Sequence, residues 1–416
     1  MRKRLAILSA GLLILAACGE QGTGTASPPP GGESPQATGG AAGDPIRVGI
    51  SLPLTGDFSE PGQGTRRGNE LWVKMVNESG GLLGRPVELI VRDDGSDPDT
   101  ANSDYEHLIT VEEVDLVFGT FSSRLVIPTS EVAERHDMLY VEGGGGAPEV
   151  FDRGLEYIFH AAPTTVDNQY IALAEWILAL PEGDRPQTAA YAILDDPFAI
   201  AGADGLMELL EEGGIETVVR EVYPPDQTEF LATAAVIADS DADIVVGGTQ
   251  FEDAVGLVRA MQELGYQPEL VTMTTGPTII EFHEALGTAV NGVMAPVGWS
   301  RTADFPTNAE FVEAFEAEYD LEATEDPAQG YAVGQVVGAA VEAVGCAEAT
   351  PECQGQLRDW LRENTVDTVM GPFSWDERGV GQGAYVMLQW QDEAIEIVLP
   401  EGPAQSSEII FPKPGW

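Results

Sequence analysis

The sequence is poor in basic residues, and this scarcity excludes one large class of function. It contains 20 Lys and Arg against 69 Asp and Glu, a formal net charge of −49. A phosphate backbone requires a basic protein face, so we expect no nucleic-acid partner. The acidic residues are scattered along the chain, and we interpret them as a solvated surface that favours solubility.

Long apolar segments are also scarce. Mean hydropathy is −0.05 and hydrophobic residues make up 43% of the chain. These values fit a soluble globular protein and argue against a polytopic membrane protein. The chain has 416 residues, more than one compact core usually takes, so we expect two domains.

Catalytic signatures are missing as well. The chain has no Gly-x-Ser-x-Gly elbow, no His-Glu-x-x-His pair and no Gly-x-x-x-x-Gly-Lys phosphate loop. Its four histidines, His107, His136, His160 and His283, are dispersed. We therefore expect neither an enzyme, nor a bound cofactor, nor a metal site.

The chain begins like an export signal. Three basic residues at positions 2–4 precede an apolar stretch over residues 5–17. This stretch is too short to span a membrane comfortably, and it predicts a signal peptide over residues 1–17. It ends in Leu15-Ala16-Ala17-Cys18, which resembles a lipobox, the bacterial signal in which the cysteine is lipidated and becomes the mature N-terminus. Ordinary cleavage near the same place is the alternative.

A segment of low complexity follows the predicted lipidation site. Residues 19–44 are mainly Gly, Ser, Pro, Thr and Gln, a composition that cannot bury a core and predicts a flexible tether over residues 18–44. Anchor, tether and globular body together predict an exported protein, held by lipid at the outer face of the cell membrane or in the periplasm.

The two remaining cysteines lie close together near the C-terminus. Six residues separate Cys346 from Cys353. In an exported protein such a pair predicts a local disulfide, with two unpaired thiols as the alternative. No histidine accompanies the pair, which argues against a metal site there.

From residue 46 onward the chain alternates between strand and helix patterns, which is typical of an α/β fold with parallel sheets and helices on both faces. In such sheets ligands bind at the carboxyl ends of the strands, so the loops that follow strands are the candidate site. The predicted strands cover residues 46–52, 86–92, 116–119, 138–141, 188–194, 216–222, 244–247 and 270–273, with a hairpin over 384–399. The predicted helices cover residues 64–77, 97–111, 123–136, 167–180, 201–212, 227–238, 253–264, 308–319, 328–344 and 356–363.

Four stretches, taken in order, resemble one known family. They are Ile50-Ser51-Leu52-Pro53-Leu54-Thr55-Gly56, Asn77-Glu78-Ser79-Gly80-Gly81-Leu82-Leu83-Gly84, Asp93-Asp94-Gly95-Ser96-Asp97-Pro98 and Thr368-Val369-Met370-Gly371-Pro372-Phe373-Ser374-Trp375-Asp376. They are similar to motifs of the branched-chain amino-acid (leucine/isoleucine/valine) binding protein family, the type I periplasmic solute-binding proteins of ABC importers. The likeness runs from about residue 45 to about residue 399.

This resemblance implies two doubly wound parallel-sheet lobes, joined by three crossing segments, that close on a ligand like a Venus flytrap. Lobe 1 would comprise residues 45–162 and 297–371, and lobe 2 residues 163–296 and 372–416. The implied function is capture of an amino acid or a related small carboxylate or amide for the permease subunits of an importer. The alternative is a sensing module of the same fold that signals to a partner receptor.

The resemblance also places the carboxylate end of a ligand. In the family a serine at the position of Ser123 helps to hold that carboxylate, and Phe121 and Ser122 belong to the same loop. Free N–H groups at a helix start favour an anion. Capping of the helix by Ser122 or Ser123 is the other interpretation, and one residue can do both.

At two positions the sequence departs from the family. Gly144 and Gly146 lie in a loop that supplies a backbone carbonyl and a threonine hydroxyl in amino-acid binders, so the hydroxyl is absent here. Thr274 stands where such binders carry an acidic residue for the ligand's ammonium. A buried ammonium needs a carboxylate partner, and Glu252 or Asp253 is the nearest substitute.

Aromatic side chains near the same loops predict cover for the apolar part of a ligand, with packing in the core as the alternative for any single one. Gln250 lies where the family often has a cleft side chain. Asp195 and Asp196 are interpreted as helix caps. The aromatic residues are Phe58, Phe121, Phe198, Phe251 and Tyr331.

Overall fold

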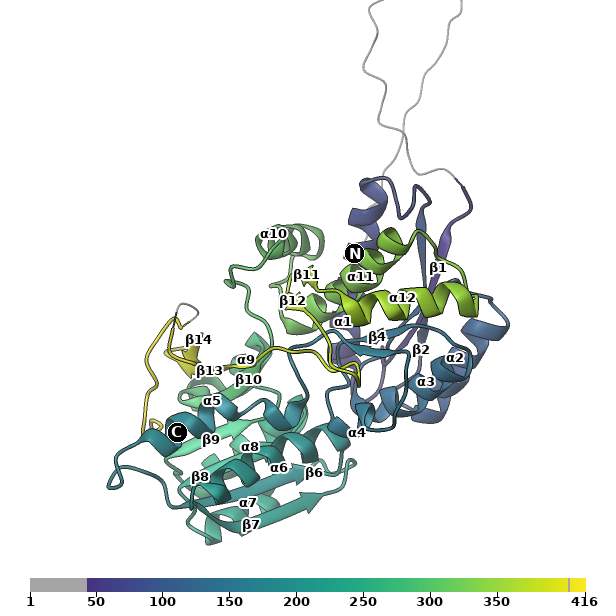
Figure 1. Ribbon diagram of the computed structural model, residues 1–416. Helices are drawn as coiled ribbons and strands as arrows, with labels where there is room; N and C mark the ends of the chain where they lie inside the picture. The colour runs from purple at the N-terminus through teal and green to yellow at the C-terminus, as the bar shows by residue number, and fades with distance from the viewer. Residues whose placement is uncertain (1–42, 403–404) are drawn as a thin grey trace, which may run out of the picture. The chain divides into compact units, whose positions relative to one another are not determined.

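The computed structural model describes residues 43–402 and 405–416 (Figure 1). The predicted signal peptide, Cys18 and nearly all of the predicted tether lie outside the described residues. In the part of the chain that the structure describes, no helix has both the length and the apolar character needed to cross a bilayer.

Five parallel strands form the first sheet, in the order β2-β1-β3-β4-β5. Consecutive residues Val48 to Leu52 of the inner strand β1 are all buried, and because successive side chains point to opposite faces, both faces are covered. The strands are β1 (Ile46–Leu52), β2 (Val87–Asp93), β3 (Leu116–Phe118), β4 (Tyr140–Glu142) and β5 (Ile158–His160), and the helices between them are α1 (Ser59–Glu78), α2 (Pro98–Thr110), α3 (Ser123–Arg135) and α4 (Pro148–Phe151).

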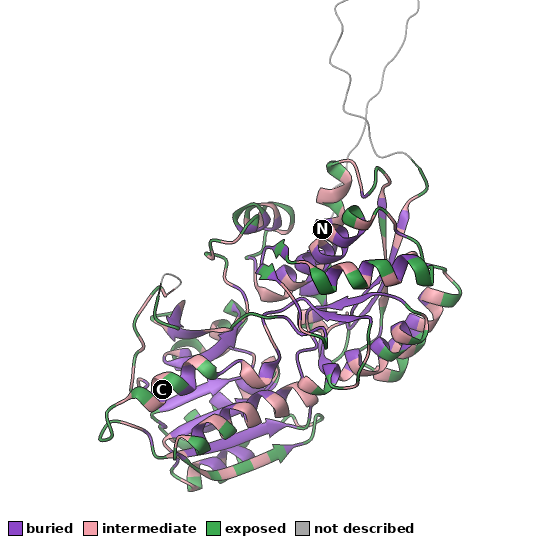
Figure 2. Ribbon diagram, in the orientation of Figure 1, coloured by how far each residue is buried: buried purple, intermediate pink, exposed green. Residues whose placement is uncertain are grey.

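Seven strands form the second sheet, in the order β14-β13-β10-β9-β8-β6-β7. Figure 2 shows that its central strands are buried like those of the first sheet. Its strands are β6 (Thr188–Leu194), β7 (Glu216–Tyr223), β8 (Ile244–Gly248), β9 (Leu270–Met273), β10 (Val293–Val297) and the antiparallel β13 (Val386–Gln391) and β14 (Ala394–Leu399). Its helical segments are η1 (Val166–Asn168), α5 (Ile171–Ala179), α6 (Pro197–Glu212), α7 (Leu231–Asp239), α8 (Phe251–Leu264), α9 (Ile280–Leu286) and η2 (Gly287–Val290).

The chain passes between the two sheets three times, after β5, after β10 and after β12, which confirms the expected fold of two lobes joined by three crossing segments. Phe373 and Trp375 pack in one core of the first lobe and Val380 in another. The third passage therefore begins after Val380, later than the expected boundary at residue 371. The elements between the second and third passages are α10 (Asn308–Tyr319), α11 (Glu325–Val344), α12 (Pro351–Glu363), β11 (Val366–Thr368) and β12 (Gly371–Phe373).

The alternating pattern is confirmed in most places and wrong in a few. Strand β1 has the predicted bounds, and Asp97 caps α2 by accepting a hydrogen bond from the Thr100 backbone N–H at 2.8 Å. Helix α1 starts at Ser59, five residues before the predicted start at residue 64. The predicted helix over 167–180 is a short 3₁₀ turn followed by α5, and α11 begins three residues before the predicted start. Strands β5, β10, β11 and β12 are too short or too apolar to show the alternation that the prediction relied on.

A disulfide joins Cys346 to Cys353 across the loop between α11 and α12. Thr350 caps α12 with its hydroxyl, which accepts a hydrogen bond from the Cys353 backbone N–H at 3.3 Å. The bridge and the cap together fasten the start of this helix to the end of α11.

Candidate ligand-binding site

The strand-end loops of both sheets surround a cavity of about 410 Å³. This volume lies in the range of small-molecule sites in proteins. Eight of the ten residues expected to bind ligand line this cavity: Phe58, Phe121, Ser122, Gly144, Gly146, Phe198, Gln250 and Thr274.

Ser123 and Tyr331 do not line it. Ser123 is fully buried, and its hydroxyl accepts a hydrogen bond from the Ala147 backbone N–H at 3.0 Å. Tyr331 packs in the first lobe's core against Phe311 and donates to the sulfur of Met75. These contacts tie the start of α3 to the cap of α4 and α11 to α1, so both side chains have a structural role.

Ser122 and Arg124 bring polar groups to the cavity at the start of α3. Ser122 is the N-cap residue, with φ of 78°, and its hydroxyl accepts from the Arg124 backbone N–H at 3.3 Å. This left-handed backbone turns Ser122 toward the cavity and Ser123 away from it. The arrangement can hold an anionic group.

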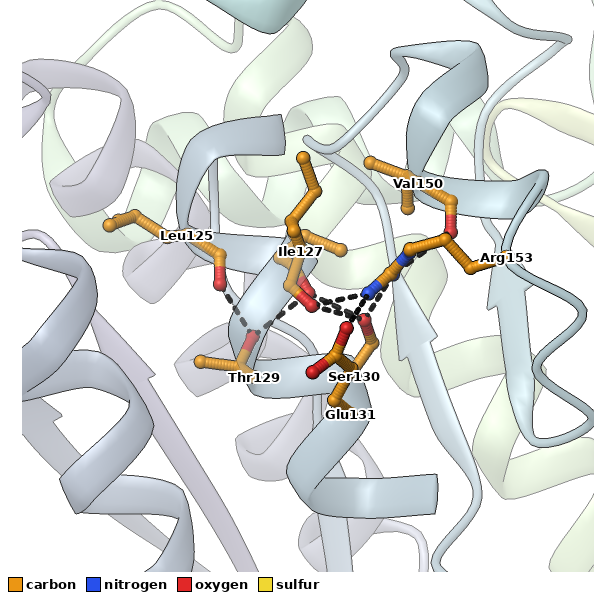
Figure 3. Close-up of polar contacts among 8 residues, drawn as sticks. Leu125, Ile127, Thr129, Ser130, Glu131, Val150 and Arg153 are labelled. Atoms are coloured by element: carbon orange, nitrogen blue, oxygen red, sulfur yellow. Dashed lines mark hydrogen bonds and ion pairs between the residues drawn. The ribbon is translucent and has the colours of Figure 1, made fainter. Parts of the chain in front are cut away.

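The first lobe holds α3 firmly in place. Figure 3 shows the guanidinium of Arg153, just after α4, reaching back to α3. It donates to the carbonyl oxygen of Ile127 and to the hydroxyl of Ser130, each at 2.6 Å, and to the carbonyl oxygen of Val150. Because five N–H donors in a planar fork serve several acceptors at once, one side chain locks two helices together.

The glycines of the neighbouring loop allow close packing around the cavity. A Cβ atom at Gly144 would lie 2.5 Å from the Phe121 ring, and one at Gly146 would lie 2.6 Å from Val166. The same Cβ atom at Gly146 would lie 3.6 Å from Nε2 of His160. The imidazole therefore stands close to the place of the missing threonine hydroxyl.

His160 was not expected in the site. Its Nδ1 lies 2.6 Å from Oε1 of Glu142, and both side chains are buried. Oε2 of Glu142 accepts from the Gly145 backbone N–H, so this pair also supports the glycine loop. Nε2 of His160 is buried without a hydrogen-bond partner among the described residues. The only sequence signal was its place at the end of β5, a strand of three residues that the pattern did not reveal.

Thr274 lines the cavity, but its hydroxyl is occupied. It donates to the carbonyl oxygen of Thr249 at 2.8 Å and accepts from the backbone N–H of the same residue at 2.7 Å. These two bonds join the ends of β8 and β9. Because a hydroxyl is uncharged and these two bonds already use its proton and one lone pair, Thr274 cannot supply the negative charge of the family's acidic residue.

Carboxylates from the second lobe reach the cavity instead. Asp196 caps α6, because its Oδ1 accepts from the backbone N–H groups of Phe198 and Ala199 at 2.9 and 3.3 Å. Asp253 accepts from the Gln250 backbone N–H at 3.1 Å at the start of α8. Burial raises the pKa of both carboxyl groups. Asp196 thus caps its helix as expected and also lines the cavity.

The first turn of α11 brings Glu325 and Asp326 to the cavity, and these residues were missed because the helix was predicted to start at residue 328. Helix α11 lies close to α1, since a Cβ atom at Gly68 would come within 2.0 Å of the Pro327 carbonyl oxygen. Burial raises the pKa of Glu325 to about 7 although one carboxylate oxygen accepts from the Gly298 backbone N–H at 2.7 Å. The pKa of Asp326 is also raised, first through burial and then through the carboxylates of Glu60 and Glu325.

Aromatic rings complete the lining. Phe58 and Phe121 contact edge to face, with ring centroids 6.2 Å apart. Phe198 and Phe251 come from the starts of α6 and α8, and Tyr385 comes from the third passage between the lobes. Apolar rings and a few polar groups are the usual lining of a site for a small organic molecule.

A cavity between two doubly wound lobes, lined by strand-end loops of both, defines a solute-binding protein. The family described as periplasmic binding protein matches residues 45–394. The chain belongs to this family. Membership of the family implies that the protein is exported.

Relatives and solved structures that are similar to this chain agree with this assignment. The Leu/Ile/Val-binding protein homolog 7 of Brucella abortus (strain 2308) is 28% identical over 396 residues, which cover 91% of this chain and 97% of the relative. The leucine-binding protein LivK from Thermotoga maritima has the same fold, with a TM-score of 0.75, 18% identity and coverage of 85% and 98% of the two chains. A solute-binding protein from R. palustris in complex with benzoate has a TM-score of 0.74, 22% identity and coverage of 88% and 99%.

Proposed function

We propose that the protein is the solute-binding component of an ABC importer and that its ligand is an amino acid or a related small carboxylate or amide. The observation that carries this proposal is the 410 Å³ cavity lined by both lobes. The relative from Brucella abortus is named for leucine, isoleucine and valine, and the R. palustris structure holds benzoate. Both names fit a small carboxylate.

In this proposal the start of α3 holds the ligand's carboxylate. Ser122 and the guanidinium of Arg124 face the cavity there, and the helix N-terminus adds positive potential. Phe121 and Phe198 cover the apolar part of the ligand from the two lobes. Residues 45–162 and 297 to about 380 form lobe 1 and the rest of the body lobe 2, with closure about the three passages.

Binding can be tested by thermal unfolding of the purified full-length protein with amino acids, amides, aliphatic acids and aromatic acids. A ligand at a hundredfold excess over its Kd should stabilise the folded state by about 2.7 kcal/mol. Arg124→Gln should abolish the shift for carboxylates, whereas Arg259→Gln, on α8 and outside the cavity lining, should leave it intact. A full panel without any shift would contradict the proposal.

Delivery to an importer and anchoring through Cys18 are tested separately in cells. Uptake of the identified ligand should stop when this protein is deleted and return when it is restored. Normal uptake in the deletion strain, with loss of a response to the ligand, would instead support the sensing module. Cys18→Ala should release the protein from the membrane fraction, and retention there would contradict the lipid anchor.

A further inference from the structure

The charged residues that line the cavity are nearly all acidic. Seven carboxylate side chains line it, against a single guanidinium, that of Arg124. Three of the seven, Asp57, Glu60 and Glu252, are exposed, and so acidic a chain would place such residues at any rim. The other four are Asp196, Asp253, Glu325 and Asp326, which are buried or half-buried.

Burial separates these four carboxylates from the acidic surface. A carboxylate withdrawn from water is costly unless a cation or N–H donors compensate it. The pKa of Asp326 is raised first by burial and then by the carboxylates of Glu60 and Glu325, and that of Asp253 first by burial and then by Asp196 and Glu252. Glu325, Asp326 and Asp253 therefore face the open cavity without a counter-cation among the described residues, whereas Asp196 has Arg124 near it.

Two acceptor atoms on opposite sides of the cavity have no hydrogen-bond partner among the described residues. Asp196 is only 2% exposed, and its Oδ2 is unpartnered while Oδ1 caps α6. Oε1 of Gln329, one turn after Glu325 on α11, is also buried and unpartnered. Buried acceptors of this kind usually have a donor, so a donor from outside the protein is expected.

These acceptors do not suit a metal ion. In residues 43–402 and 405–416, no three His, Cys, Asp or Glu side chains are grouped closely enough to hold one. Phenylalanine rings line the same cavity, and they favour an organic cation with an apolar stem over a hydrated ion.

We propose that the site selects a small organic cation whose primary ammonium or guanidinium group donates to Glu325, Asp326 and Oε1 of Gln329. This inference rests on the proposed function and defines its ligand class more closely. A ligand that also carries a carboxylate reaches Arg124 with its other end. Hydrogen-bond donors matter because a quaternary ammonium would neutralise the charge but leave the acceptors unpaired.

Matched ligands test the inference by calorimetric titration of the purified full-length protein. L-Lysine and L-norleucine differ in the ε-ammonium, and L-arginine and L-citrulline in the charge of the terminal group. We expect each cation to bind at least tenfold more tightly than its neutral partner, and Nε-trimethyl-lysine to bind more weakly than lysine. Glu325→Gln combined with Asp326→Asn should remove this preference, whereas Glu342→Gln, on the exposed part of α11, should keep it.

The outcomes separate the inference from the proposed function. If norleucine or citrulline binds as tightly as its charged partner, the cation inference is wrong and the solute-binding function stands. If wild type prefers the cations but Glu325→Gln combined with Asp326→Asn prefers them equally, α11 is not the cation-binding element and the inference fails. If no amino acid, acid or amide binds, both proposals fail.

Discussion

The two lobes build their sides of the cavity from the same elements, but the residues at their helix starts differ in charge. On each side a parallel strand ends and a helix begins at the cavity. Helix α3 of the first lobe starts with a serine hydroxyl and carries Arg124, whereas α6 and α8 of the second lobe start with buried carboxylates. An acidic side chain at a helix start occupies the amide groups that would otherwise attract an anion. The identity of the capping residue therefore decides whether a helix start can attract an anion, as at α3, or not, as at α6 and α8; the carboxylates of the proposed cation site come from α11 of the first lobe.

The largest expected change in stability tests whether the buried pair of His160 and Glu142 stabilises the first lobe's side of the cavity. His160→Ala should lower the free energy of unfolding by at least about 3 kcal/mol, because it leaves the Glu142 carboxylate buried without its partner. His136→Ala is the matched control, since its contact with Glu106 is partly exposed and worth under about 1 kcal/mol. Urea unfolding of both variants measures the difference, and equal losses would show that the buried pair is not structural.

A substitution at Gly146 tests whether the family's threonine can be restored. Gly146→Thr should cost about 1–3 kcal/mol, because its Cβ atom would lie 2.6 Å from Val166. Gly183→Thr is the control, since a Cβ atom there meets no heavy atom within 4 Å. Thermal unfolding distinguishes the two, and a stable Gly146→Thr protein would mean that Val166 and its neighbours can move aside.

The two helix caps Asp196 and Asp97 should make stability depend on pH in opposite directions. Burial raises the pKa of Asp196, so the stability contributed by this group is present at low pH and lost as pH rises through its folded value. Hydrogen bonds from Thr100 lower the pKa of Asp97, so its contribution is present above the unfolded value and lost as pH falls. Asparagine keeps the capping oxygen. The stability of Asp196→Asn minus that of wild type should therefore increase from pH 4 to pH 7. For Asp97→Asn the same difference should decrease. Melting curves at the two pH values would contradict this account if both variants changed in the same direction.

The smallest expected effect concerns Glu325. Its pKa is raised to about 7, so its contribution to stability is full below the unfolded value of 4.5 and is lost as pH rises through about 7. Without ligand, Glu325→Gln should be more stable than wild type at pH 8 by about 1 kcal/mol, after allowance for solvent screening, and nearly equal to it at pH 4.5. Denaturant unfolding at both pH values measures this, and a variant less stable than wild type at pH 8 would show that the ionised carboxylate is compensated.

Sequence alone determined the alternation of strands and helices, the two-lobe family, the bounds of β1 and the cap at Asp97, and eight of the ten residues that it predicted to bind ligand do line the cavity. These features depend on local patterns and motifs, which a linear chain displays directly. The tertiary structure decided that Ser122 rather than Ser123 faces the cavity, through one left-handed backbone angle. It also brought His160, Glu325 and Asp326 into the site. Their places depend on a three-residue strand and on the close contact between α1 and α11, and pairings between segments so distant in sequence leave no periodic signal to read.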